Sequence, residues 1–396
     1  MKFCVKKSVL AKCLQFARRV ANGRKRQNLA LLEADENRVR ITVVDSHIKM
    51  RQEIPGCRIE SAGRTTASMK KMSSLVTKVK GEEVEVEARN AFVKMKSESA
   101  ELNAEEGVDT NGFEINHLEG KALVETDGIA FSDALKRVAF AAGGKDNWRR
   151  LDVVNIAPGE SFIELTATDG CRLATAKIPV SGNLGTGIVI PVESAKKIGA
   201  ILSSNKKLIM LGVTDASLHI ESEGIEFTVE KVYTQFPDYK SVIPQDYKNT
   251  FTVNADKLLE AIKKLPLTRD SSLTVEFNQG AGVVYPYNEK AAAVQIEGKY
   301  SGEEISISLR SKFVVEMLKV VGKEQLKISV RDKNSPVVIT AGDNYLYAVM
   351  PIVEEEAKPD VAQEEEQKPQ EASDGAECEE ESDEELVAEG SEGITQ

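Results

Sequence analysis

The chain has 396 residues, of which 41% are hydrophobic and 29% charged, a composition typical of a soluble protein with two or three folded domains. It contains no run of about 18 apolar residues, and its first segment, MKFCVKKSV, lacks the apolar stretch of a signal peptide, so we expect a cytoplasmic protein without a membrane span. The five cysteines form no Cys-x-x-Cys pair, which predicts buried, reduced thiols and argues against disulfides and zinc.

The net charge of −11 is distributed unevenly along the chain. Residues 354–396 carry 18 Asp and Glu against 2 Lys, a net charge of −16, so residues 1–353 hold the remaining 45 acids and 50 bases, a net charge of +5. The acidic segment has almost no large apolar residues with which to offset the entropy of ordering. We therefore expect a mildly basic folded body followed by a disordered acidic tail.

The chain opens with a short apolar strand and then a pattern that predicts an amphipathic helix. Apolar residues recur at helical spacing from Leu10 to Val20, and Ser8 is the expected N-terminal cap. The same pattern returns 248 residues later with Asp256 as the expected cap, and a copy one residue shorter covers residues 129–143 with Ser132 as cap. The same opening therefore occurs three times.

A second amphipathic helix is predicted in each copy. These helices are expected near residues 68–80, 192–203 and 311–321, and a pair of short strands follows each of them. Each copy then contains two helices and about eight short strands joined by tight turns.

One hairpin shows the repeat most clearly. In LTATDGCRLA, residues 165–174, alternation predicts two strands, and Asp169-Gly170 predicts the tight turn between them. The segment ITVVDSHIKM lies 124 residues earlier and puts Asp45 in the place of Asp169, and a looser third copy begins at Val283. Because a period of 124 residues is too long for a solenoid, we predict one domain copied three times.

These elements predict an α+β fold of three tandem domains, each with two helices packed on antiparallel sheet. We expect the first domain at residues 1–119, the second at 120–247, the third at 248–353 and the acidic tail at 354–396.

Basic side chains lie opposite the apolar stripe on all six predicted helices. A positive face on every helix concentrates charge on one surface and predicts diffuse contact with phosphates, which carries no base specificity. The alternative is that Lys and Arg are simply good solvated helix formers. The residues are Lys12, Arg19, Lys71, Lys78, Lys136, Arg137, Lys196, Lys197, Lys257, Lys264, Lys312 and Lys319.

Four segments resemble the bacterial sliding clamps, the beta subunits of the replicative DNA polymerase III. They are MKFCV at the start, TATDGCRLA at 166–174, FPDYKSVIP at 236–244, and SPVVI with AVMPI between 335 and 352. The resemblance covers residues 1–353. It implies DNA-clamp domains that form half of a six-domain ring, a head-to-tail homodimer that encircles duplex DNA as a polymerase processivity factor. It also implies that the polymerase, the clamp loader and repair proteins dock by short peptides, and that no cofactor or metal is needed.

The resemblance places a peptide pocket between the second and third domains. A small apolar cleft of this kind suits a Leu or Phe anchor on an extended peptide, whereas the alternative is that these are ordinary hairpin and junction residues. Cys171 stands where the family usually has His, and Ser241 where it often has Arg, which leaves the peptide specificity open. The pocket residues are Leu151, Thr168, Gly170, Cys171, Arg172, Leu173, Pro237, Ser241, Val242, Ser335, Ala348, Met350, Pro351 and Ile352.

Further DNA contacts and the dimer interface also follow from the resemblance. Trp148, the only tryptophan, could stack on a nucleotide or simply pack its loop. Arg24, Lys145, Arg149 and Arg150 match family positions that touch the duplex, and we expect Lys25, Arg26 and Trp148 to contribute because they lie in the same two loops. The interface is expected to bring the strand near Leu102 against the helix end near Pro266 and Leu267.

A different class of function is a metal-dependent nuclease that uses Asp45, Asp169 and nearby acids. Two observations argue against it. Both aspartates fall at hairpin turns, where Asp is favoured for backbone reasons. The three histidines are far apart and form no metal-binding or hydrolase motif, so no catalytic residue is predicted.

A third class of function is an interaction scaffold in which the acidic tail is the functional segment. The tail could shield the peptide pocket or compete with DNA for the basic helices, since blocks of like charge often act as interaction segments. We expect a truncation after Val353 to bind DNA and clamp-motif peptides more tightly than the full chain at low salt. Binding assays over a salt series measure this, and equal affinities for both ligands would leave the tail as a solubilising appendage.

Overall fold

The computed structural model describes residues 1–21, 29–89, 92–97, 100–105, 112–115, 123–144, 149–204, 206–268, 270–278 and 281–352. Within these residues the protein contains six α-helices and four antiparallel sheets, and no helix there is long and apolar enough to span a membrane. The helices are α1 (Lys7–Val20), α2 (Met69–Lys78), α3 (Gly128–Ala139), α4 (Val192–Leu202), α5 (Ala255–Lys263) and α6 (Ser311–Val321). The predicted α+β class, with two helices in each copy, is confirmed.

The caps expected for the first helix of each copy are wrong. α1, α3 and α5 begin directly where a strand ends, so Ser8, Ser132 and Asp256 lie inside the helices rather than before them. The cap of α3 is Asp127, which accepts a hydrogen bond from the Ala130 N–H at 2.8 Å. Ser132 is buried and donates to the Gly199 carbonyl of α4 at 2.7 Å, which joins the two helices of the middle copy.

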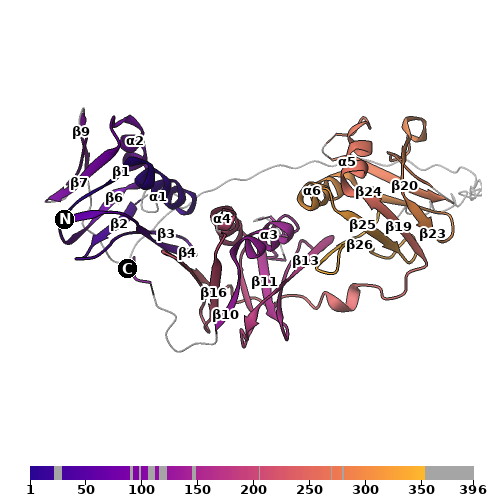
Figure 1. Cartoon of the computed structure of the whole chain (residues 1–396). Coiled ribbons are helices and arrows are strands. Elements are labelled where there is room, and N and C mark those ends of the chain that lie inside the picture. Colours follow the sequence, from indigo (N-terminus) through magenta and orange to yellow (C-terminus); the bar gives the residue numbers. More distant parts are fainter. Residues whose placement is uncertain are drawn as a thin grey trace, which may run out of the picture. The chain divides into compact units, whose positions relative to one another are not determined.

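The helices form a continuous series of contacts. α2 packs on α1, α1 on α4, α4 on α3, α3 on α6, and α6 on α5 (Figure 1). The series passes from one copy of the domain to the next at the α1–α4 and α3–α6 contacts. Every helix buries its apolar stripe against the sheets in one shared hydrophobic core.

Two sheets are confined to one copy each. The five-stranded sheet has the order β5 (Arg58–Ser61), β1 (Lys2–Lys6), β7 (Glu83–Arg89), β8 (Phe92–Ser97), β9 (Ala100–Glu105). The four-stranded sheet has the order β22 (Val294–Ile296), β21 (Ala281–Pro286), β20 (Ser272–Asn278), β24 (Ile305–Arg310).

Two nine-stranded sheets cross from one copy to the next. The first has the order β14 (Ser181–Gly182), β10 (Leu123–Asp127), β16 (Leu208–Val213), β17 (Ser217–Ser222), β18 (Ile225–Glu230), β4 (Ile48–Ile54), β3 (Val39–Asp45), β2 (Leu29–Ala34), β6 (Gly63–Ser68). The second has the order β15 (Ile188–Pro191), β11 (Val153–Pro158), β12 (Phe162–Thr168), β13 (Arg172–Pro179), β27 (Tyr345–Val349), β26 (Val337–Ala341), β25 (Gln325–Val330), β19 (Asn249–Asn254), β23 (Lys299–Ser301).

Both nine-stranded sheets follow one plan. Five strands come from one copy and four from the copy before it, and the junction is the antiparallel pairing of β18 with β4 in the first sheet and of β27 with β13 in the second. The five-stranded sheet repeats the five-strand part of this plan, with β9 in the place of β18 and β27. The four-stranded sheet repeats the four-strand part, with β22 in the place of β4 and β13.

Four cysteines lie in the described residues, and all are free thiols. Cys4 and Cys13 are buried and Cys57 is half-buried, and burial raises the pKa of Cys13 to about 11 and of Cys57 to about 12. Cys171 is exposed, contrary to the expectation of buried thiols, because it occupies the tip of the β12–β13 hairpin.

Candidate functional site

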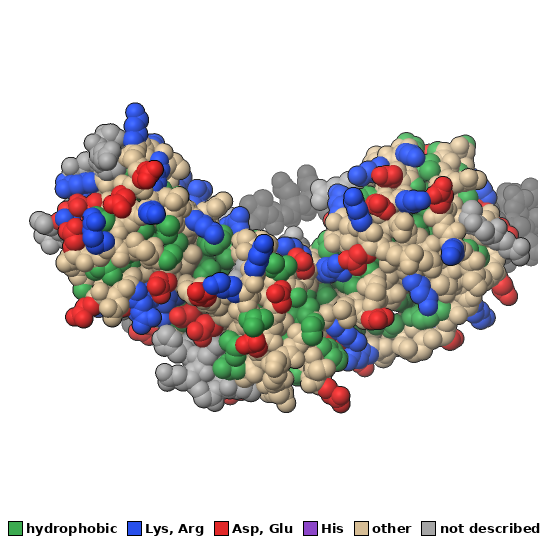
Figure 2. Space-filling view, in the orientation of Figure 1, with side chains coloured by type: hydrophobic (Ala, Val, Ile, Leu, Met, Phe, Trp, Pro, Cys, Tyr) green, Lys and Arg blue, Asp and Glu red, His purple; other side chains and the backbone are tan. Residues whose placement is uncertain are grey.

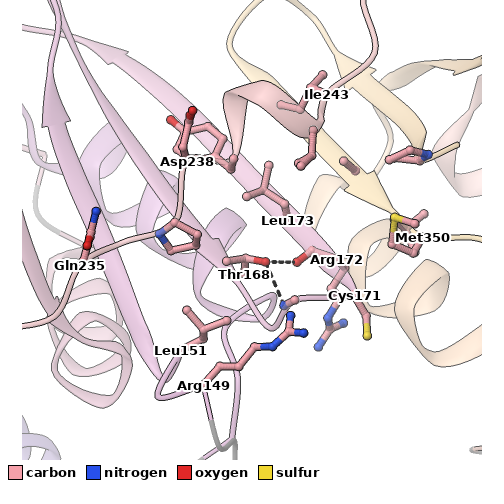
Figure 3. A pocket seen from close by; sticks show the side chains of 17 residues that line it. Arg149, Leu151, Thr168, Cys171, Arg172, Leu173, Gln235, Asp238, Ile243 and Met350 are labelled. Atoms are coloured by element: carbon pink, nitrogen blue, oxygen red, sulfur yellow. Dashed lines mark hydrogen bonds between the residues drawn. The ribbon is translucent and has the colours of Figure 1, made fainter.

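A cavity of about 380 Å³ lies beside the junction of β13 and β27 (Figure 3). Most of its lining comes from the tip of the β12–β13 hairpin, the irregular stretch at residues 235–243 and the end of β27, and the rest from residues 149–151 and Pro336. Its lining includes ten of the predicted pocket residues, namely Leu151, Thr168, Gly170, Cys171, Arg172, Leu173, Pro237, Val242, Ala348 and Met350. The remaining lining residues, which the resemblance did not assign to the pocket, are Arg149, Gln235, Asp238, Tyr239, Ile243, Pro336 and Val349.

Four predicted pocket residues are absent from the lining and lie around it. Ser241 donates to the Asp238 carbonyl at 2.9 Å within a 3₁₀ turn, η2 (Lys240–Val242). Ser335 is buried and donates to the Asp332 carboxylate at 2.6 Å. Pro351 is buried next to the lining residue Met350, and the Ile352 N–H donates to Ser308 of β24 at 2.8 Å.

The hairpin tip in the pocket is shaped by its own side chains. The Asp169 carboxylate accepts hydrogen bonds from the backbone N–H groups of Cys171 and Arg172 at 2.9 and 3.0 Å. Thr168 Oγ1 donates to the Arg172 carbonyl at 2.6 Å and accepts from the Gly170 N–H at 3.1 Å. Gly170 has φ +93°, a backbone conformation that favours glycine, and a Cβ there would lie 2.6 Å from Arg149 Nη1, at the movable end of that side chain.

Arg172 lies in the pocket wall, but its guanidinium N–H groups donate hydrogen bonds to other parts of the protein. Its side chain is 6% exposed and donates to Asp169 at 2.9 Å, to Glu316 of α6 at 2.6 Å and to the Phe140 carbonyl at 2.8 Å. Its guanidinium also lies 4.3 Å from the ring centroid of Phe313. Arg172 therefore joins the second and third copies of the domain behind the pocket.

The surface of the pocket is mainly apolar and open to solvent. Val242 is 61% exposed and Met350 is 43% exposed, so both side chains present apolar surface to solvent beside the cavity. Cys171 is an exposed residue of the lining, and the Arg149 side chain points up toward the hairpin tip from below (Figure 3). Such a site can take an apolar side chain and offer a few polar contacts to the backbone around it.

Most of the predicted basic residues lie on exposed positions of the helices. Figure 2 shows Lys and Arg side chains over the region of α3 and α4, with Asp and Glu beside them. The exposed members are Lys12, Arg19, Lys71, Lys78, Lys136, Lys196, Lys257, Lys264 and Lys319, and Lys312 is half-buried. Of these, Lys136 and Lys196 pair with acids of their own helices, at 3.2 Å and 3.4 Å, and Lys257 pairs with Glu297 at 2.6 Å.

Arg137 and Lys197 differ from the other helix cations because each forms an ion pair with an acid of a neighbouring copy. Lys197 of α4 pairs with Asp45 at the end of β3 and donates to the Val20 carbonyl of α1 at 2.9 Å. Arg137 of α3 pairs with Glu324 and lies 5.5 Å from the ring centroid of Tyr345. Their charges are balanced within the protein, so they are weaker candidates for phosphate contact.

Of the predicted loop and interface residues, the structure describes some and leaves others outside its described residues. Arg24, Lys25, Arg26, Lys145 and Trp148 lie outside the described residues, as does the side chain of Leu102 on β9. Arg149 lines the pocket rather than a helix face, and Arg150 is exposed with φ 51°. Pro266 is exposed, and Leu267 is half-buried against the core.

The two aspartates of the nuclease hypothesis are engaged in separate structural roles. Burial opposes ionisation of Asp45, but Lys197 and the Ser46 N–H outweigh it and lower the pKa of this carboxyl. Asp169 holds the hairpin tip and Arg172. Among the described residues, the one group with metal-ligand geometry is Cys4, Glu60 and Glu85, which contains neither aspartate. Lys2 bridges the two glutamates of that group at 2.7 and 3.1 Å.

Three domain families match the chain in succession. Residues 1–118 match the N-terminal domain of the DNA polymerase III beta subunit, residues 125–238 the central domain, and residues 240–353 the C-terminal domain. The beta sliding clamp of Bacillus subtilis is 24% identical over 365 residues, covering 86% of this chain and 95% of the relative. That of Halalkalibacterium halodurans is 26% identical over 341 residues, covering 78% and 87%.

Solved structures share the fold. A crystal structure of the DNA polymerase sliding clamp from Bacillus subtilis superposes with a TM-score of 0.81 at 22% identity, covering 89% of this chain and 99% of that one. The DNA polymerase III subunit beta from Pseudomonas aeruginosa superposes with a TM-score of 0.80 at 17% identity, covering 89% and 100%.

Proposed function

Because this chain belongs to the DNA polymerase III beta subunit family over residues 1–353, we propose that it is a sliding clamp, a processivity factor that holds the replicative polymerase on duplex DNA. The proposed domains are residues 1–119, 120–247 and 248–353. The main support for the proposal is that two sheets continue from one domain into the next. The same strand plan leaves one sheet end in the first domain and one in the third without its partner strands, and these two ends could pair to close a ring.

The unpaired sheet ends favour a head-to-tail homodimer. The five-stranded sheet ends at β9 and the four-stranded sheet ends at β22, and together they have the nine strands of each inter-domain sheet. By the shared plan, β9 of one chain should pair with β22 of its partner, as β18 pairs with β4 and β27 with β13. Closing both ends leaves neither edge open to other chains, and a heterologous contact that returns on itself forms a closed ring.

The interface residues fit this pairing. Leu102 lies on β9, opposite Met95 in the register of β8 and β9. Pro266 and Leu267 follow α5 in the third domain, and α5 contacts β21 and β22. The proposed interface therefore joins β9 and Leu102 of one chain to β22 and the α5 end of the other.

The series of helices supplies the DNA-facing surface of the proposed ring. Exposed cations on successive helices can neutralise phosphates without reading bases, so the ring can slide. Retention of DNA then depends on ring closure rather than on the strength of any contact. No covalent chemistry, cofactor or metal is part of this function.

The salt dependence of DNA binding tests the helix surface. Replacing Lys71 and Lys78 of α2 with Gln should reduce the slope of log K against log salt by about 0.9 for each phosphate that the protein no longer neutralises. Binding of linear duplex DNA measured over a salt series gives this slope. The control is Lys299→Gln with Lys333→Gln, which removes the same charge from exposed positions away from the helices and should leave the slope unchanged.

The pocket is the proposed docking site for partners. An apolar cavity with exposed Val242 and Met350 favours a Leu or Phe anchor, and we propose that the polymerase, the clamp loader and repair proteins present such anchors on extended peptides. Work on DNA with these partners implies a cytoplasmic location, which is part of the proposal.

One experiment tests the ring directly. The protein should have the solution mass of a dimer, and once loaded it should stay on nicked circular DNA but leave linear DNA through the ends. Equal loss from circles and linear duplexes would contradict encirclement. A monomer that nevertheless stays on circles would contradict the proposed dimer.

A further inference from the structure

One wall of the pocket has little regular structure of its own. Residues 235–243 contain only the single turn η2, and their backbone hydrogen bonds are local, such as Tyr239 N–H to the Pro237 carbonyl at 2.9 Å and Val242 N–H to the Tyr239 carbonyl at 3.3 Å. A segment of this kind needs side chains to fix it over the sheet.

Tyr239 is the side chain that ties this wall to the sheet. Its hydroxyl donates to the Glu164 carboxylate and accepts from Thr166 Oγ1 at 3.3 Å, and both partners belong to β12. Burial and the Glu164 carboxylate raise the pKa of Tyr239 well above its usual range, so the phenol keeps the proton that it donates. The ring packs with Ile243 against a small apolar cluster that includes Leu173 and Ala348.

The hydrogen bond lies on the far side of the wall from the pocket. A second cavity of about 720 Å³ shares Tyr239 and Ile243 with the pocket, and Glu164 lines that second cavity but not the pocket. Glu164 is 8% exposed, and Lys177 and Lys240 lie 3.6 and 4.0 Å from its carboxylate, which balances the buried charge. Tyr239 therefore presents its ring to the pocket and bonds through its hydroxyl to a group outside it.

We propose that the Tyr239–Glu164 hydrogen bond is a positioning contact that holds the pocket wall in the place where it can receive a peptide. This inference rests on the proposed docking function of the pocket. Tyr239 and Glu164 then set the fraction of molecules whose pocket is ready to bind, and the hydroxyl does so without touching the peptide.

The expected effect is on association. When only a fraction of molecules is competent, the apparent dissociation constant rises as the inverse of that fraction. A hydrogen bond to a charged group is strong enough to change the competent fraction by about tenfold. Once a peptide is bound it holds the wall itself, so its dissociation rate should change little.

The test uses Tyr239→Phe in the full chain and a fluorescein-labelled octapeptide that ends in Leu-Phe. Stopped-flow binding should show an association rate constant about tenfold lower than in the original protein, with dissociation unchanged within about twofold. Retention on circular DNA should be unaffected. The matched control is Tyr247→Phe, because Tyr247 packs in the same apolar cluster and its hydroxyl makes no hydrogen bond within the described part of the chain.

Substitutions of Glu164 test the same hydrogen bond from its other partner, and they serve if Tyr239→Phe folds poorly. Glu164→Gln retains an acceptor for the hydroxyl and should bind peptide like the original protein, whereas Glu164→Ala should repeat the slow association. Normal association of both Tyr239→Phe and Glu164→Ala, or a loss that appears only as faster dissociation, overturns the inference. If the original protein itself does not bind the peptide, the proposed docking function fails instead.

Discussion

Replacing Arg172 with alanine is expected to lower the free energy of unfolding by about 3–5 kcal/mol, the usual cost of removing one partner from a buried, hydrogen-bonded charge pair. The Arg172 side chain contacts Asp169 at 2.9 Å and Glu316 at 2.6 Å, and both carboxylates would lose their guanidinium. The Phe140 carbonyl would lose its donor as well. Urea denaturation followed by circular dichroism measures the change.

The loss should also weaken the pocket, because Arg172 joins the hairpin tip to α6 behind it. Peptide binding by Arg172→Ala should fall together with stability. The control is Arg38→Ala, whose exposed side chain pairs with Asp35 at 3.5 Å and whose removal should leave the unfolding free energy nearly unchanged. A stable Arg172→Ala protein with an intact pocket would contradict this role of Arg172 and leave the pairing of β13 with β27 as the main link between the two domains.

Placing a charge at the proposed interface is expected to separate the dimer. Leu102→Asp would put a carboxylate where β9 meets the partner chain, and an unpaired buried charge costs enough to raise the dimer dissociation constant by at least about a hundredfold. Analytical ultracentrifugation at micromolar concentration should show mainly monomers. The same protein should no longer stay on circular DNA.

A control variant on the same strand distinguishes the effect of adding a charge from the effect of the strand face on which the charge lies. Asn103 is the next position on β9, and successive positions of a strand alternate between its two faces, so Asn103→Asp adds the same charge at a position of the other face. We expect that variant to remain a dimer. Dimers of Leu102→Asp that still hold circular DNA would contradict the assignment of this strand face to the interface.

The sequence alone determined the features that depend on neighbouring residues. Apolar spacing predicted all six helices because a 3.6-residue period appears within a few turns, and α6 occupies the predicted residues 311–321. Asp169-Gly170 predicted the β12–β13 hairpin because its turn is built from the local bonds of Asp169. The caps expected for α1, α3 and α5 were wrong because each helix begins earlier, directly at the end of a strand, so that α3 is capped by Asp127 rather than by Ser132.

The tertiary structure decided what each charged side chain does. Lys197 and Lys196 look alike on one helix, yet Lys197 pairs with Asp45, 152 residues away, and Lys196 pairs with Glu193 on its own helix. Tyr239 of the pocket wall bonds to Glu164, 75 residues away, and the Arg149 guanidinium lies against Gly170 of the pocket. Helical periodicity and turn chemistry involve neighbouring residues, so the sequence shows them directly. Contacts between residues far apart in the chain form only when the chain folds and its sheets join. No local pattern therefore distinguishes a solvent-exposed Lys or Arg from one that pairs with an acid of another domain.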